Sequence, residues 1–168
     1  LLKLILKLIN HHQSFQELKM IDSHCHLYFE NISKKIDEII NKSKDNNITS
    51  ILSINTNPID FNDHYNLIKN YKGIYMSYGL HPCEIKSLDQ LLVLDFDKYC
   101  NKSYVVGIGE TGIDLYHSNI LLNEQIRSFE LHIQASIKNN LPLIIHQRNS
   151  EKEIIDNLKN YLHHNLKI

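Results

Sequence analysis

The chain has 168 residues, of which 42% are hydrophobic and 22% are charged, and its formal net charge is -1. This length is enough for one domain with a sizeable core, and the charge excludes nucleic-acid binding that depends on a general positive field. Three cysteines, at positions 25, 83 and 100, do not make a disulfide framework and therefore favour a reducing cytoplasm.

Residues 1–19 are predicted to be a leader that is not part of the domain, which occupies residues 20–168. The stretch Leu1–Ile9 is almost wholly apolar but far too short to span a bilayer, and no small-residue cleavage site follows it. Met20 stands directly before the first predicted strand. The alternative is a short amphipathic helix that packs on the domain or on a partner.

From Met20 onward, short apolar runs alternate with longer stretches of helical pattern. The order strand–helix, repeated five times, predicts a parallel α/β fold. Two closures compete: a doubly wound open sheet, or a (β/α)8 TIM barrel of which only the first five units are present. The predicted strands are 20–23, 48–54, 74–78, 104–108 and 141–145, and the predicted helices are 33–44, 58–69, 88–100, 122–139 and 150–163.

Residues that can bind a metal stand at the ends of the predicted strands. His24 and His26 close the first strand, His81 follows the third, Glu110 follows the fourth and His146 ends the fifth. In a strand, alternate side chains share a face, so His24 and His26 can hold one ion together. Because the carboxyl ends of parallel strands meet at one side of the fold, we expect these residues to converge on a metal site.

Each of these residues also has a purely structural interpretation. His146 could be a core histidine hydrogen-bonded to the backbone, and His81 could line a turn before a proline. Glu110 could cap the following helix, although the glycines around it argue for a site. Cys25 alternates to the opposite face from its neighbours and is predicted to be a packing residue.

Taken together, four segments resemble the TatD-type metal-dependent hydrolases, a deoxyribonuclease family of the amidohydrolase superfamily. The resemblance also includes Gln125 and Phe129 on the helix after Glu110, and it covers the chain from Met20 to about residue 160. The segments are Asp22–Leu27, Tyr78–Pro82, Gly107–Asp114 and Pro142–Arg148.

This resemblance implies a (β/α)8 barrel with two divalent metal ions, which could be Zn²⁺, Mn²⁺ or Mg²⁺. By the same likeness, His24 and His26 hold the first ion, the catalytic Glu110 bridges both, and His146 binds the second. Two such ions activate water and neutralise charge on a phosphodiester, so the implied substrate is DNA. His81 and Arg148 are predicted to bind substrate. For Arg148 the reason is its planar guanidinium group, whose two N–H donors match phosphate oxygens. No membrane or obligate protein partner is indicated.

The family also carries a histidine after the sixth strand and an aspartate after the eighth, whereas this sequence stops at Ile168. His163 and His164 fall in the predicted fifth helix and are expected to face solvent. We therefore expect little turnover from the chain as given. Two other interpretations stay open: a non-catalytic metal-binding remnant or half-barrel that needs a complementing chain, and a hydrolase of a small ester or amide.

Overall fold

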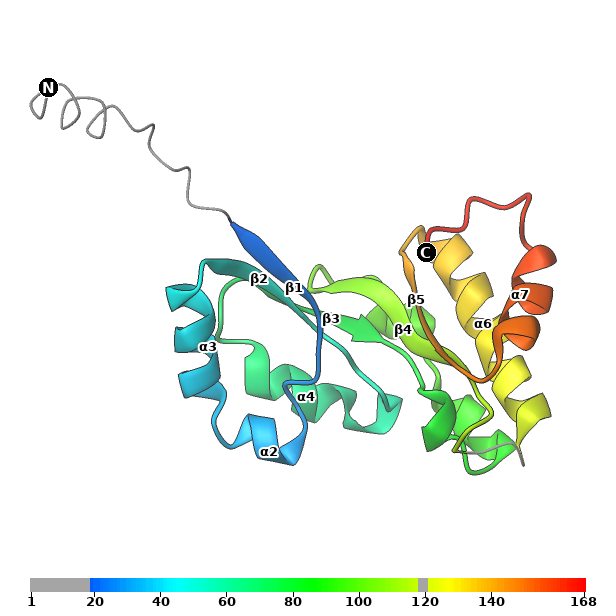
Figure 1. Cartoon of the computed structure of the whole chain (residues 1–168), viewed down its shortest axis with the longest axis horizontal. Coiled ribbons are helices and arrows are strands. Elements are labelled where there is room, and N and C mark those ends of the chain that lie inside the picture. The colour runs from blue at the N-terminus through cyan, green and yellow to red at the C-terminus, as the bar shows by residue number, and fades with distance from the viewer. Residues whose placement is uncertain (1–18, 118–120) are drawn as a thin grey trace, which may run out of the picture.

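The fold is built on one parallel sheet. The computed structural model describes residues 19–117 and 121–168. Neighbouring strands follow chain order, β1-β2-β3-β4-β5, and every pair is parallel. The sheet curls, with helices along its outer side (Figure 1). The strands are β1 (Met20–Cys25), β2 (Ile48–Ser53), β3 (Ile74–Tyr78), β4 (Val105–Asp114) and β5 (Leu143–Arg148).

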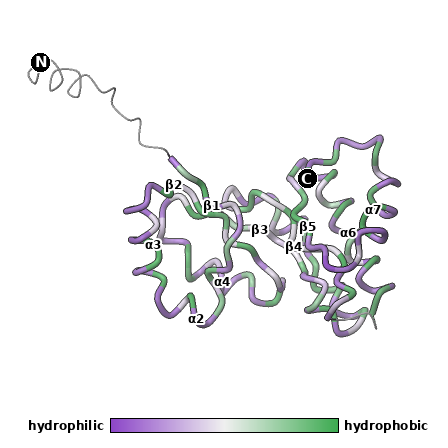
Figure 2. Tube along the Cα trace, viewed as in Figure 1, coloured by the Kyte–Doolittle hydropathy of each residue, from purple (hydrophilic) through white to green (hydrophobic). Residues whose placement is uncertain are grey.

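The connections between strands contain both α-helices and 3₁₀ turns. The longest helix, α6, shows why they pack on the sheet: its buried residues recur three and four positions apart, from Gln125 through Phe129 to Ser136. Figure 2 shows hydrophobic and hydrophilic residues alternating along the helices in the same way. The helices are α2 (Glu30–Ser33), α3 (Ile36–Asp45), α4 (Phe61–Ile68), α5 (Phe96–Tyr99), α6 (Leu122–Asn139) and α7 (Glu151–Lys159), and the 3₁₀ turns are η1 (Pro58–Asp60), η2 (Pro82–Glu84) and η3 (Leu88–Val93).

The core lies between the sheet and these helices. Phe61 on α4 is fully buried. Its ring lies edge-on to that of Tyr78, with centroids 5.1 Å apart, and at a tilt to that of Tyr99, with centroids 4.5 Å apart. Under α6, Phe129 and Ile133 are also fully buried. This packing leaves the carboxyl ends of the strands free to carry polar side chains.

The strand order decides between the two predicted closures. A doubly wound sheet reverses its order at a switch point, whereas these five strands run in sequence and curl as the strands of a TIM barrel do. The fold is therefore part of a (β/α)8 barrel, as predicted. Among the described residues no helix has both the length and the apolar character needed to cross a membrane.

The prediction for the fourth strand was wrong at its carboxyl end. The predicted strand ended at residue 108, whereas β4 continues to Asp114. Glu110 therefore lies within the strand and does not follow it. The glycines near Glu110 allow two backbones to approach closely. Gly112 has φ +141°, and a Cβ placed there would lie 2.0 Å from the carbonyl oxygen of His146. Strand β5 also continues beyond His146, to Arg148.

The prediction of one continuous helix over 88–100 was also wrong, because this segment is divided into η3 and α5. The break lies at Asp95. Its carboxylate accepts a hydrogen bond from the backbone N–H of Lys98 at 3.0 Å, which starts a new helix. Its own N–H donates to the hydroxyl of Tyr78 at 2.8 Å, which ties the break to the core.

The last predicted helix ends early. Helix α7 stops at Lys159, so His163 and His164 lie in the turn after it, where both are exposed as expected. The chain leaves the helix because it returns beside β5, where the N–H of Leu143 donates to the carbonyl of Lys167 at 2.9 Å. The helix predicted over 33–44 corresponds to α3, with the short α2 before it, and the predicted leader lies almost wholly outside the described residues.

Candidate metal centre

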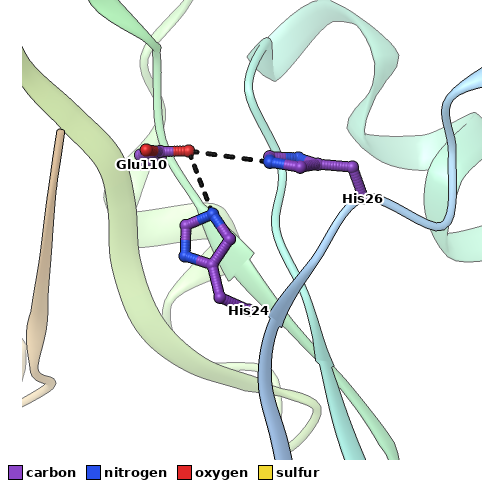
Figure 3. Close-up of side chains that lie close together, drawn as sticks. All are labelled: His24, His26 and Glu110. Atoms are coloured by element: carbon purple, nitrogen blue, oxygen red, sulfur yellow. Dashed lines mark ion pairs between the residues drawn. The ribbon is translucent and has the colours of Figure 1, made fainter.

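Two histidines from the first strand face a glutamate from the fourth. His24 lies on β1 and His26 one residue beyond its end, and both direct Nε2 at Glu110 of β4 (Figure 3). The distances from Nε2 to Oε2 of Glu110 are 3.4 Å for His24 and 3.9 Å for His26. The curl of the sheet brings together residues more than 80 positions apart, as the strand-end argument predicted.

A distortion of β4 directs Glu110 into this position. Between the pairs Ile108–Leu143 and Thr111–Ile145, β4 advances three residues while β5 advances two. The extra residue of such a bulge changes the direction in which the following side chain points. Glu110 is 8% exposed, and its N–H donates to the carbonyl of Asn55 at 3.2 Å. The carboxylate is therefore held at the inner end of the site.

His146 contacts the other oxygen of the same carboxylate. Its Nδ1 lies 3.4 Å from Oε1 of Glu110, while its Nε2 lies 3.0 Å from Oδ2 of Asp114. An ionised carboxylate only accepts hydrogen bonds, so Nε2 carries the proton and donates it to Asp114. This leaves Nδ1 as the nitrogen that faces the site. A histidine held on one nitrogen by a carboxylate is the usual arrangement of a metal ligand.

Asp114 was quoted in the family motif but was not predicted as a site residue. A signal for it was present, because Glu110, Gly112 and Asp114 alternate along one strand and so share a face. Asp114 is fully buried, and its backbone is held by Gln125, whose Oε1 accepts from the N–H of Asp114 at 2.8 Å. The error followed from ending the fourth strand too early.

His81 lies close to the second half of the centre: one ligand atom from each of His81, Glu110 and His146 lies within 4.8 Å of the others, but the hydrogen bond of His81 favours another role. Its ring lies edge-on to that of His146, with centroids 4.3 Å apart, and its Nδ1 accepts a hydrogen bond from the N–H of Cys83 at 3.1 Å. In a neutral imidazole the other nitrogen then carries the proton. The Nε2–H of His81 is therefore a donor, which suits contact with an anionic substrate better than coordination.

The charges of the centre follow from these contacts. Burial would raise the pKa of Glu110, but the interactions with His146 and the other histidines hold it below its ordinary value. Burial likewise opposes ionisation of Asp114, yet its hydrogen-bond donors keep its pKa well below the usual range. Burial lowers the pKa of His26, and that of His81 to about 4. At neutral pH the centre thus offers ionised carboxylates and the neutral imidazoles of His26 and His81, whereas the contacts of His146 with Glu110 and Asp114 raise the pKa of that histidine.

These residues fit a divalent ion. One ligand atom from each of His24, His26 and Glu110 lies within 4.8 Å of the others. Ligands at bond lengths of about 2.0–2.2 Å around one ion are separated by about 3–3.5 Å, close to the separations seen here. Neutral imidazole and ionised carboxylate are ligands for several divalent metals, so the ligand set by itself selects a class of ion and no single element.

Arg148 lies next to this centre, and its side chain stacks on the ring of Tyr116. It follows His146 by two residues on β5, and its guanidinium carbon lies 4.1 Å from the centre of the Tyr116 ring. This stacking is a favourable cation–π arrangement. It holds the charge of Arg148 at the rim, and the predicted role in substrate binding stays a prediction.

Cys25 is directed away from the centre. Its thiol lies 3.6 Å from the carbonyl oxygen of Leu52 and packs against the core, as the alternation along β1 predicted.

Comparison with known proteins places this chain among metal-dependent hydrolases. A model of the family described as TatD related DNase matches residues 21–168. A protein of Buchnera aphidicola subsp. Baizongia pistaciae, described as an uncharacterized metal-dependent hydrolase, is 38% identical over 143 residues, which are 83% of this chain and 54% of the relative. The Danio rerio protein tatdn3, provisionally described as a deoxyribonuclease, is 27% identical over 83% of this chain and 57% of its own length.

A solved structure shows the same fold. The crystal structure of YjjV, a TatD homologue from Escherichia coli K12, aligns with a TM-score of 0.74 and 25% identity, over 84% of this chain and 56% of that one. This likeness confirms the partial barrel. The chain spans about half the length of the relatives that it matches.

Proposed function

Because this chain belongs to the TatD family of metal-dependent hydrolases, we propose that its metal centre holds two divalent ions and hydrolyses phosphodiester bonds of DNA. The observation that carries the proposal is the position of Glu110. Its Oε2 faces His24 and His26, and its Oε1 faces His146. A carboxylate with separate ligands at each oxygen is suited to bridging two ions.

Each side chain then has a distinct task. His24 and His26 with Oε2 of Glu110 would hold one ion, and His146 with Oε1 would hold the other. Two ions supply an activated water and neutralise the charge that develops on the phosphodiester. His81 donates a hydrogen bond from Nε2 to a phosphate oxygen.

The choice of DNA rests on two supports. The matching family is described as TatD related DNase, and tatdn3 is given the same activity provisionally. Arg148, held over Tyr116, offers a planar cation to a neighbouring phosphate. A reducing compartment such as the cytoplasm suits the three cysteines, all of which are free thiols.

One observation favours a second candidate, the hydrolysis of a small ester or amide. The cavity beside Glu110 has a volume of about 380 Å³, and no lysine or arginine is among the described residues that line it. Such a cavity admits a small neutral substrate as readily as a phosphate.

The test compares both substrate classes. The chain is freed of metal, reloaded with Mn²⁺ and incubated with end-labelled DNA and with a chromogenic ester, beside Glu110→Gln as the matched variant. In keeping with the little turnover predicted from the sequence, we expect only a low yield of DNA products, and this yield should require both Mn²⁺ and Glu110. Hydrolysis of the ester alone would support the second candidate. Metal binding with no hydrolysis of either substrate would instead support a non-catalytic metal-binding remnant or a half-barrel that needs a complementing chain.

A further inference from the structure

A second group of metal-binding side chains lies on the far side of His146 from Glu110. Cys83 comes from η2, Asp114 ends β4, and His117 follows in the next turn. The thiol of Cys83 lies 3.3 Å from Oδ2 of Asp114, and Nδ1 of His117 lies 2.9 Å from the same oxygen. One ligand atom from each of the three lies within 4.8 Å of the others.

Oδ2 of Asp114 has more hydrogen-bond donors than it can accept well. His146 also donates to it, at 3.0 Å, so three donors converge on one oxygen. A carboxylate oxygen has about two lone-pair positions. If one ion replaced the protons of Cys83 and His117, Oδ2 would have two partners, the ion and the N–H of His146. These would match its two lone-pair positions.

The three groups also have the chemistry and the spacing of a cation site. Zinc binds sulfur at about 2.3 Å, and imidazole nitrogen and carboxylate oxygen at about 2.0–2.2 Å, so ligands of one ion are separated by about 3–3.7 Å. The two distances to Asp114 lie at or near that range. Asp114 is fully buried, whereas the side chain of His117 is 51% exposed, which gives an ion a way in from solvent.

We propose that Cys83, Asp114 and His117 form a further binding site for a thiophilic divalent cation, best fitted by Zn²⁺. On binding, the S–H bond of Cys83 breaks as the sulfur–metal bond forms, and the proton goes to solvent. His117 coordinates through Nδ1 while its proton moves to Nε2 by exchange with water. Asp114 contributes a lone pair from Oδ2, and a water completes four ligands. No electron is transferred.

A thiol distinguishes this site from the metal centre. His24, His26, Glu110 and His146 offer only nitrogen and oxygen, whereas soft thiolate ligands favour Zn²⁺ over Mn²⁺ and Mg²⁺. The proposal does not depend on DNA hydrolysis, because it concerns ion binding at other side chains. The two sites are linked through Asp114, which contacts His146 directly.

Cobalt spectroscopy on the full chain tests the proposal. Metal-free protein is titrated with Co²⁺, and coordination by Cys83 is expected to give a near-ultraviolet thiolate-to-cobalt charge-transfer band. The band should vanish in Cys83→Ser and persist in Cys25→Ser, the matched control, whose thiol packs toward Leu52. His117→Ala should weaken the Co²⁺ binding that produces the band by at least the roughly 10- to 100-fold that loss of an outer partner costs.

A band that is absent from the unmodified chain, or undiminished in Cys83→Ser, would overturn the proposal. X-ray absorption on the unmodified chain loaded with Zn²⁺ needs no variant, and so it decides the matter even if Cys83→Ser fails to fold. We expect a sulfur shell at about 2.3 Å. A spectrum that fits nitrogen and oxygen alone would refute the site, whether or not the chain hydrolyses DNA.

Discussion

Replacing Asp114 by Asn tests how the metal centre is held. Asp114 accepts the Nε2 proton of His146 at 3.0 Å, which directs Nδ1 toward Glu110. An asparagine has the same size and can keep one oxygen for the backbone N–H groups of Tyr116 and His117, but it loses the negative charge that fixes the tautomer of His146. Loss of such an outer partner typically weakens metal binding by about 10- to 100-fold. This corresponds to about 1.4–2.7 kcal/mol.

The assay is Mn²⁺ binding, measured from the electron paramagnetic resonance signal of free Mn²⁺ at equilibrium. Mn²⁺ is chosen because it favours nitrogen and oxygen ligands over the thiol of Cys83, so the titration reports on the metal centre. The control is Asp156→Asn on α7, where the carboxylate pairs with Lys152 and Lys159 in solvent. Equal Mn²⁺ affinity in Asp114→Asn, Asp156→Asn and the unmodified chain would refute the supporting role of Asp114.

Three more predictions follow from the same contacts. Changing His24 and His26 together to Ala should remove bound divalent metal, as measured by elemental analysis of the purified chain; unchanged content would contradict the centre. His132 is fully buried with a pKa lowered to about 4 by burial, so the unfolded chain takes up its proton first as the pH falls. The free energy of unfolding should therefore decrease from pH 6.5 to 4, by up to about 3 kcal/mol, and urea denaturation should show a flatter dependence in His132→Gln. Gly112→Ala should lower the melting temperature more than Gly107→Ala. An alanine at 112 adds about 1–3 kcal/mol of backbone strain, whereas the new methyl group at 107 meets mainly the flexible end of the Ile144 side chain. Equal melting temperatures of the two variants would contradict this.

Much of the fold could be predicted because its elements have strong local patterns. Helix 122–139 matches α6 in both bounds, since a long amphipathic stretch ends at Asn140, which adopts the left-handed conformation with φ 52°. The strand 74–78 also matches β3. The region 88–100 failed because its break depends on Tyr78, a residue on a distant strand, and no local pattern contains that contact.

The site was predictable where the logic of parallel strands applies. His24, His26, Glu110 and His146 converge because residues at the carboxyl ends of neighbouring strands share one end of the sheet. Their hydrogen bonds could not be predicted in the same way. That His81 accepts at Nδ1, and therefore presents a donor at Nε2, depends on the short turn η2 that places the N–H of Cys83 beside it.

The length of β4 explains why one strand can serve both groups of ligands. Glu110 and Asp114 are four residue steps apart along β4, a rise of about 13 Å in an extended strand, yet both carboxylates reach the single ring of His146. His146 pairs with Gly112, which lies midway between them on β4, and the extra residue between Ile108 and Thr111 changes the direction in which Glu110 points. Pairing with β5 then fixes Asp114 opposite Arg148, so that His146 is held between two carboxylates from its own neighbouring strand. The glycine at 112 permits this pairing, because any side chain there would strike the carbonyl of His146 and move the ring away from both.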